Sequence, residues 1–189
     1  MAAASVAANT SVTIDSVTGL PMRRFSEAEI AAVAMPKTAF VETPLIEADY
    51  DKYFYFQRPD TSFDEAYADI IECDALSSGA SYYGGGDFGS TAAFAQYGVL
   101  PSAIGGAIGS VIADAVFGSA VRRQMRRTNL RNCMGFKGYD RYGLEKDLWQ
   151  DFNFEEGLDR ENAKNRAEAL LKQARVASGP APQQKALGL

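Results

Sequence analysis

The sequence predicts a mainly α-helical protein with an irregular N-terminal half that contains a short strand, a long helix rich in small residues, shorter helices and extended tails. Three observations lead to this fold class. Two Ser-x-x-Glu capping boxes each open a segment with helical spacing of apolar residues. Small residues recur at every fourth position between residues 105 and 118, as on one face of a helix. Apolar residues make up 47% of the chain, which excludes a wholly disordered protein.

The N-terminal part of the chain is expected to be largely irregular. Residues 1–25 are predicted to form a flexible arm, within which Ser11–Val17 is interpreted as a short edge strand. Ser26 and Glu29 have the spacing of a capping box. They are expected to open a short helix that runs to Met35, where Pro36 stops it.

An aromatic run and a second capped helix follow. The run Tyr53–Gln57 favours β-structure, and it is interpreted as a strand or as an aromatic arm laid across another element. Ser62 and Glu65 form the second capping box, which opens a helix that Gly79 ends. The apolar face of this helix consists of Phe63, Ala66, Tyr67, Ile70 and Cys73. Its other face is expected to carry Asp64, Glu65, Asp69, Glu72 and Asp74.

Residues 101–133 are expected to form one long helix with its small side chains on one side. Glycine inside a helix costs about 1 kcal/mol relative to alanine. The repeated glycines therefore indicate a close approach by another helix or by a bilayer. The alternative is that one of the chain's own helices covers this face within a single domain. The predicted packing face consists of Gly105, Gly106, Gly109, Ser110, Ala113, Asp114 and Gly118.

The C-terminal part is divided by composition. Residues 26–157 are predicted to form a single helical core region, and residues 158–177 a charged C-terminal helix. Residues 178–189 are interpreted as a disordered end or as a docking arm. Within the core region, the expected packing anchors at helical spacing are Leu144, Leu148, Trp149 and Phe152.

The residue types exclude several kinds of chemistry. The chain has no histidine, which excludes Ser-His and Cys-His nucleophilic sites and histidine-based metal sites. Carboxylate pairs such as Asp69 and Glu72 are interpreted as solvated or paired with arginines. We therefore expect no enzymatic activity, no metal and no cofactor. The net charge of −5 also argues against non-specific binding to nucleic acid.

Two segments together resemble a known family. The run Gly105–Gly109 followed by the segment Asn132–Tyr139 is similar to glycine-zipper proteins of the Gram-negative cell envelope. The segment from Tyr53 to Asp74 is similar to uncharacterised alphaproteobacterial members. The resemblance implies a periplasmic or outer-membrane-associated location, although no secretory signal is visible in the sequence.

The two cysteines could form a disulfide or remain as buried thiols, and two ligands are too few for a zinc site. Because the chain resembles periplasmic proteins, we expect Cys73 and Cys133 to form an intrachain disulfide. Such a bridge would place the helix at 62–78 beside the arginine-rich helix. At least one arginine–carboxylate pair is then expected between them, the alternative being that both faces are solvated. The candidates are Asp69, Glu72, Arg126, Arg127 and Arg131.

These observations favour a non-enzymatic structural or assembly protein of the envelope, which packs on a second copy or on an envelope partner. The alternative is a single-pass, membrane-anchored accessory subunit, because the 23 residues of Val99–Val121 are long enough to span a bilayer. Asp114 opposes insertion. A third class, a cytosolic enzyme or binding module, has no recognisable site. A single span would put the two cysteines on opposite sides of the membrane, so a disulfide and a single span exclude each other.

Overall fold

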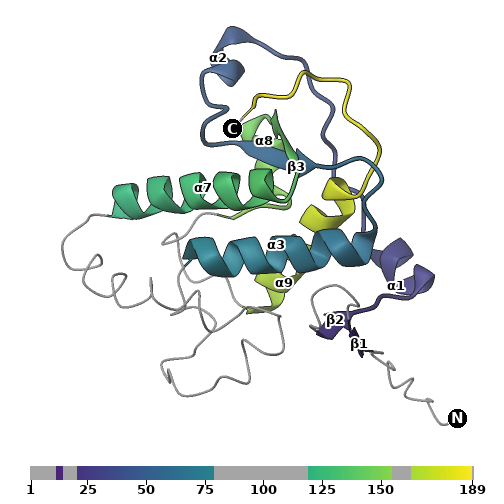
Figure 1. The fold of residues 1–189 in the computed structure, drawn as a ribbon. Coiled ribbons are helices and arrows are strands. Elements are labelled where there is room, and N and C mark those ends of the chain that lie inside the picture. The colour runs from purple at the N-terminus through teal and green to yellow at the C-terminus, as the bar shows by residue number, and fades with distance from the viewer. Residues whose placement is uncertain (1–11, 15–20, 79–118, 155–162, 189) are drawn as a thin grey trace, which may run out of the picture.

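The computed structural model describes residues 12–14, 21–78, 119–154 and 163–188, and their fold is mainly α-helical, as predicted (Figure 1). The N-terminal elements are the strands β1 (Val12–Ile14) and β2 (Pro21–Arg23) and the helices α1 (Glu27–Ala32) and α2 (Pro44–Glu47). The strand β3 (Phe54–Gln57) and the helix α3 (Phe63–Ser78) follow. The C-terminal elements are the helices α7 (Ser119–Phe136), α8 (Lys146–Gln150) and α9 (Ala163–Ala177), with the strand β4 (Asp140–Gly143) between α7 and α8.

Helix α3 is the central element of the described structure. It packs against both α7 and α9, and Figure 1 shows α7 lying alongside it. The predicted apolar face of α3 is confirmed, since four of its five residues are buried and Tyr67 packs at the edge of the core. The buried residues shared by these three helices include Ala66, Ile70, Cys73, Met134, Leu170 and Ala174.

The first capping box is formed as predicted. The Ser26 hydroxyl accepts a hydrogen bond from the Glu29 amide, and the Glu29 carboxylate accepts one from the Ser26 amide at 2.8 Å. Helix α1 ends at Ala32, earlier than the predicted end at Met35. The second box is only half formed: Ser62 Oγ accepts from the Glu65 amide, whereas the Glu65 carboxylate bonds to Arg58.

The aromatic run forms a strand, one of the two predicted alternatives. β3 pairs antiparallel with β4, with Phe54 opposite Gly143 and Gln57 opposite Asp140. The rings of Tyr55 and Tyr142 stack across this pair with centroids 5.6 Å apart. A second core cluster is packed around them, and it contains the buried predicted anchors Leu144, Trp149 and Phe152, with the partly buried Leu148 against it.

The end of α7 directs the chain into β4. Gly138 has a φ of +84°, in the left-handed region that glycine adopts without a steric penalty. The Tyr139 amide donates to the Met134 carbonyl at 3.1 Å, and the Gly138 amide donates to the Gly135 carbonyl at 3.0 Å. This pair of bonds is a Schellman motif, which ends the helix and turns Tyr139 back onto the core.

Helix α9 is part of the core, which corrects the predicted division at residue 157. Leu170, Ala174 and Ala177 are buried in the same cluster as the apolar face of α3. The chain after α9 lies over the β3–β4 pair, where the Leu187 amide donates to the Arg141 carbonyl at 2.8 Å. The side chain of Gln57 also donates to the Gly179 carbonyl at 3.1 Å. Of the two predicted alternatives for the tail, the described residues form a docked arm.

Candidate functional site

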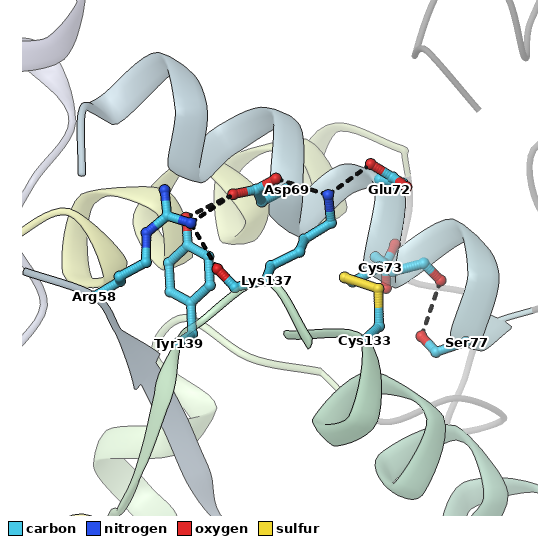
Figure 2. Close-up of a disulfide and its surroundings, with 9 residues drawn as sticks. Arg58, Asp69, Glu72, Cys73, Ser77, Cys133, Lys137 and Tyr139 are labelled. Carbon is cyan, nitrogen blue, oxygen red and sulfur yellow. Dashed lines mark hydrogen bonds and ion pairs between the residues drawn. A yellow bond between two sulfur atoms is a disulfide. The ribbon is translucent and has the colours of Figure 1, made fainter. Parts of the chain in front are cut away.

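The α3–α7 junction, where the end of α7 packs against α3, concentrates the side chains that the sequence singles out (Figure 2). The predicted disulfide is present: Cys73 of α3 is bonded to Cys133 of α7, with their Cα atoms 5.5 Å apart. Cys73 is completely buried. The bridge joins two positions that are 60 residues apart in the sequence.

Lys137 links the two predicted acidic residues one turn beyond the disulfide. Its Nζ lies 2.8 Å from Asp69 Oδ1 and 2.8 Å from Glu72 Oε2 (Figure 2). Burial alone would lower the pKa of Lys137. The hydrogen bonds and charges of the two carboxylates outweigh burial, so the pKa of Lys137 is raised above its ordinary value. The lysine is therefore an ammonium ion at neutral pH.

Tyr139 and Arg58 complete the junction. The Tyr139 hydroxyl donates to Asp69 Oδ2 at 2.9 Å, and the Arg58 guanidinium lies 4.6 Å from the centre of the tyrosine ring. Arg58 also donates to the Lys137 carbonyl at 2.6 Å. Burial raises the pKa of Tyr139, and the negative charge of Asp69 raises it further. The phenol is therefore neutral and acts as a hydrogen-bond donor.

The predicted charge pairing between the helices is present, but with a different acidic residue. Asp69 and Glu72 pair with Lys137 rather than with an arginine of α7. Arg126 of α7 instead pairs with Asp74 of α3. The other two predicted arginines are placed as follows: Arg127 is half-buried on α7, and Arg131 pairs with Asp51 in the segment before β3.

Asp74 is the main residue that the sequence reasoning misplaced. It was expected on the polar face of α3, but its side chain is only 2% exposed and contacts both Arg126 and Arg166. Both guanidinium groups lie near the Phe154 ring, at 5.1 and 4.4 Å from its centre. The signal was present in the spacing, because Asp74 follows the buried Ile70 by four residues and so lies on the same helix face.

Asp64 is a second carboxylate that was expected on the polar face and is buried. It accepts a hydrogen bond from the Phe25 amide at 3.0 Å, and Arg24 lies 3.5 Å from its other oxygen. The Phe25 ring in turn packs edge-on against Phe63 and Tyr67. This contact holds the segment before α1 against the start of α3.

The groups at the α3–α7 junction join the two helices covalently and through ion pairs. Both sulfurs are bonded, the lysine is protonated and the phenol is neutral, so these groups supply no nucleophile at neutral pH. Among the residues that the structure describes, no group of three or more histidine, cysteine, aspartate or glutamate side chains is placed to hold a metal ion. A polar hollow of about 170 Å³ lies elsewhere, between α8 and α9, and Lys172 and Asp151 line it.

The predicted packing face at residues 105–118 lies outside the described residues, so its seven members remain predictions. No helix in the described parts of the chain has the length and apolar character needed to cross a bilayer. No protein-family model matches the chain, and comparisons with curated proteins and with solved structures return no match either.

Proposed function

We propose that this chain is a non-enzymatic structural or assembly protein of the bacterial cell envelope. In this proposal a disulfide-closed helical body carries the small-residue segment 101–118 as a surface for packing against another helix. The observation that carries the proposal is the Cys73–Cys133 bridge. Stable structural disulfides form in oxidising compartments such as the periplasm and are rare in the cytosol.

The position of the bridge supports the assembly role. The small-residue segment lies in the sequence between the two bridged cysteines, after the end of α3 at Ser78 and before the start of α7 at Ser119. Both ends of the intervening chain are therefore anchored to one rigid pair of helices. A segment that is tethered at both ends loses less conformational entropy when it binds than one tethered at a single end.

The bridge also argues against the single-pass alternative. A single crossing by residues 99–121 would leave Cys73 and Cys133 on opposite sides of the bilayer, where they could not bond. The partner that we propose is accordingly a second copy of the chain or an envelope protein, with membrane association arising through that partner.

The packing role can be tested by replacing Gly106 and Gly109 with leucine. The bulky side chains should block the close approach of a second helix, so the oligomeric mass of the oxidised full-length protein should fall. The matched control is the double variant Ile108→Leu and Ile112→Leu, which keeps the apolar volume on the other side of the helix. Mass is measured by light scattering coupled to size exclusion, and envelope association by fractionation.

Two outcomes would overturn the packing role. Unchanged mass and unchanged envelope association in the glycine double variant would show that the glycine rows are not an assembly surface. A loss of stability at unchanged mass would show that one of the chain's own helices covers them. The compartment is tested separately, by alkylating thiols in intact cells: two freely alkylated cysteines would contradict an oxidising location.

A further inference from the structure

Two arginines from different elements converge on one oxygen atom beside β3. Arg131 of α7 and Arg141 of β4 place their Nη1 atoms 3.2 and 3.7 Å from the same Oδ1 atom of Asp51. The arginine side chains are only 15% and 9% exposed, whereas the Asp51 side chain is 80% exposed. The two guanidinium groups are thus largely buried, while the Asp51 carboxylate that they share is exposed to solvent.

Among the residues that the structure describes, the charges of this group do not balance. The two guanidinium ions share the single carboxylate of Asp51, and the neighbouring Asp49 is paired with Lys52 at 2.6 Å. Burial lowers the pKa of Arg141, and the positive charge of Arg131 lowers it further. The repulsion between the two arginines is therefore only partly offset by Asp51.

The arginines are positioned by contacts that do not involve Asp51. Arg141 donates from Nε to the Gly188 carbonyl at 3.1 Å and from Nη1 to the Tyr50 carbonyl at 3.3 Å. Arg131 donates from Nη2 to Thr128 Oγ1 at 3.4 Å. Both guanidinium groups also lie within 6 Å of the Phe54 ring, at 5.9 and 5.5 Å from its centre. Their arrangement would therefore persist if the carboxylate moved away.

We propose that Arg131 and Arg141 form a binding site for a phosphate group, in which the Asp51 carboxylate occupies the position of one phosphate oxygen and is displaced by the ligand. Guanidinium groups bind phosphate through paired, charge-assisted hydrogen bonds. A phosphate carries more negative charge than the aspartate that it replaces, so it offsets the arginine repulsion more completely. The phosphate could belong to a small soluble molecule or to the headgroup of an anionic phospholipid.

Binding can be observed directly on the oxidised full-length protein. Inorganic phosphate is titrated while the Nε–Hε resonances of the arginines are followed by NMR. The resonances of Arg131 and Arg141 should shift together and saturate. The lipid source is tested by co-sedimentation with vesicles of phosphatidylglycerol and phosphatidylcholine, with pure phosphatidylcholine vesicles as the uncharged reference.

A charge-matched pair of variants tests the role of Asp51. Asp51→Asn removes the competing carboxylate and should tighten phosphate binding by about tenfold, the effect of one charged hydrogen-bonding group. Asp49→Asn changes the net charge by the same amount at the neighbouring pair with Lys52. It should change the affinity by less than about threefold.

A second pair of variants tests the role of Arg131 in binding phosphate. Arg131→Gln should weaken phosphate binding by about tenfold or more, and Arg131→Lys should weaken it less because the charge is retained. Lys164→Gln removes an exposed cation on α9 and should leave binding unchanged. Circular dichroism and a thiol count identify any variant that has not folded. If Arg131→Gln does not fold, the phosphate affinity of Arg131→Lys decides whether Arg131 binds the ligand.

The proposal is overturned if phosphate moves neither arginine resonance in the wild type or in Asp51→Asn. It is also overturned if Asp51→Asn binds no more tightly than Asp49→Asn, or if Arg131→Lys binds as the wild type does. Binding to phosphatidylglycerol vesicles that Arg131→Gln abolishes identifies a lipid headgroup as the source. Saturable binding of phosphate without binding to vesicles identifies a soluble phosphate.

Discussion

Asp74 of α3 and Arg126 of α7 form an ion pair whose side chains are 2% and 9% exposed, so both charges are largely withdrawn from water. The second oxygen of the same carboxylate contacts Arg166 of α9. One carboxylate therefore joins the three helices that make up the main core. A buried charge of this kind is costly when its partner is removed, so replacement of Asp74 is expected to be strongly destabilising.

Asp74→Asn is expected to lower the free energy of unfolding by about 3–5 kcal/mol, because two buried arginines would lose the negative charge that Asp74 supplies. The measurement is urea unfolding of the oxidised protein at neutral pH. Asp49→Asn serves as the control, since Asp49 and Lys52 form an exposed pair and their separation should cost much less. Equal losses of unfolding free energy in Asp74→Asn and Asp49→Asn would show that the burial of Asp74 does not add to its contribution.

Removal of the disulfide by Cys73→Ala and Cys133→Ala together is expected to cost about 4 kcal/mol, from the loop entropy of a 60-residue bridge. Each single variant breaks the same bond, so each should lose nearly as much as the double variant. Thermal and urea unfolding of the three proteins, beside reduced wild type, provides the comparison. A double variant that loses twice as much as either single variant would show that the cysteines contribute independently.

Gly143→Ala is expected to destabilise the β3–β4 pair by about 1–3 kcal/mol through overpacking. A Cβ atom at residue 143 would lie 2.5 Å from the Tyr50 ring, which is buried and whose hydroxyl donates to Glu42 at 2.9 Å. The penalty should shrink when Tyr50→Leu is introduced as well, because the smaller side chain leaves room for the methyl group. The same penalty in both backgrounds, measured by urea unfolding, would exclude the ring as its cause.

Stability is expected to fall at alkaline pH through Tyr55. Burial raises the pKa of Tyr55 to about 12, whereas the residue ionises near pH 10 in the unfolded chain. The folded state therefore binds the proton more tightly, and its stabilisation is complete below pH 10 and is lost as the pH rises from 10 through 12. Melting temperatures between pH 8 and 12 should decline less steeply in Tyr55→Phe than in the wild type. Parallel declines would rule out this residue as the source.

The sequence predicted best those features that depend on neighbouring residues. The capping box at Ser26, the apolar face of α3 and the packing anchors around Trp149 all follow from spacings of three or four positions. The pairing of the two cysteines was predicted from a resemblance, and the choice was simple because only two are present. The β-strand at residues 54–57 was one of two open alternatives, because an isolated aromatic run does not reveal its partner strand.

The features that sequence reasoning missed depend on residues far apart in the chain. The spacing from Ile70 places Asp74 on the buried face of α3, but its partners Arg126 and Arg166 lie 52 and 92 residues away in the sequence, and no local pattern indicates that pairing. The burial of α9 was missed for a different reason. Its overall composition is charged, and its apolar residues are few, yet Leu170, Ala174 and Ala177 are buried in the core that α9 shares with α3, and Val176 is buried in the second cluster.

The contacts of Gln57 have a consequence for the order in which the protein folds. Its side chain bonds to the carbonyl of Gly179, 122 residues later, and the strand that contains it pairs with β4. A chain that grows from its N-terminus therefore produces β3 and α3 long before their partners exist. The Cys73–Cys133 disulfide likewise cannot form until Cys133 has been synthesised, 60 residues later. The folded core can close only when almost the whole polypeptide is present, which predicts slow folding dominated by distant contacts.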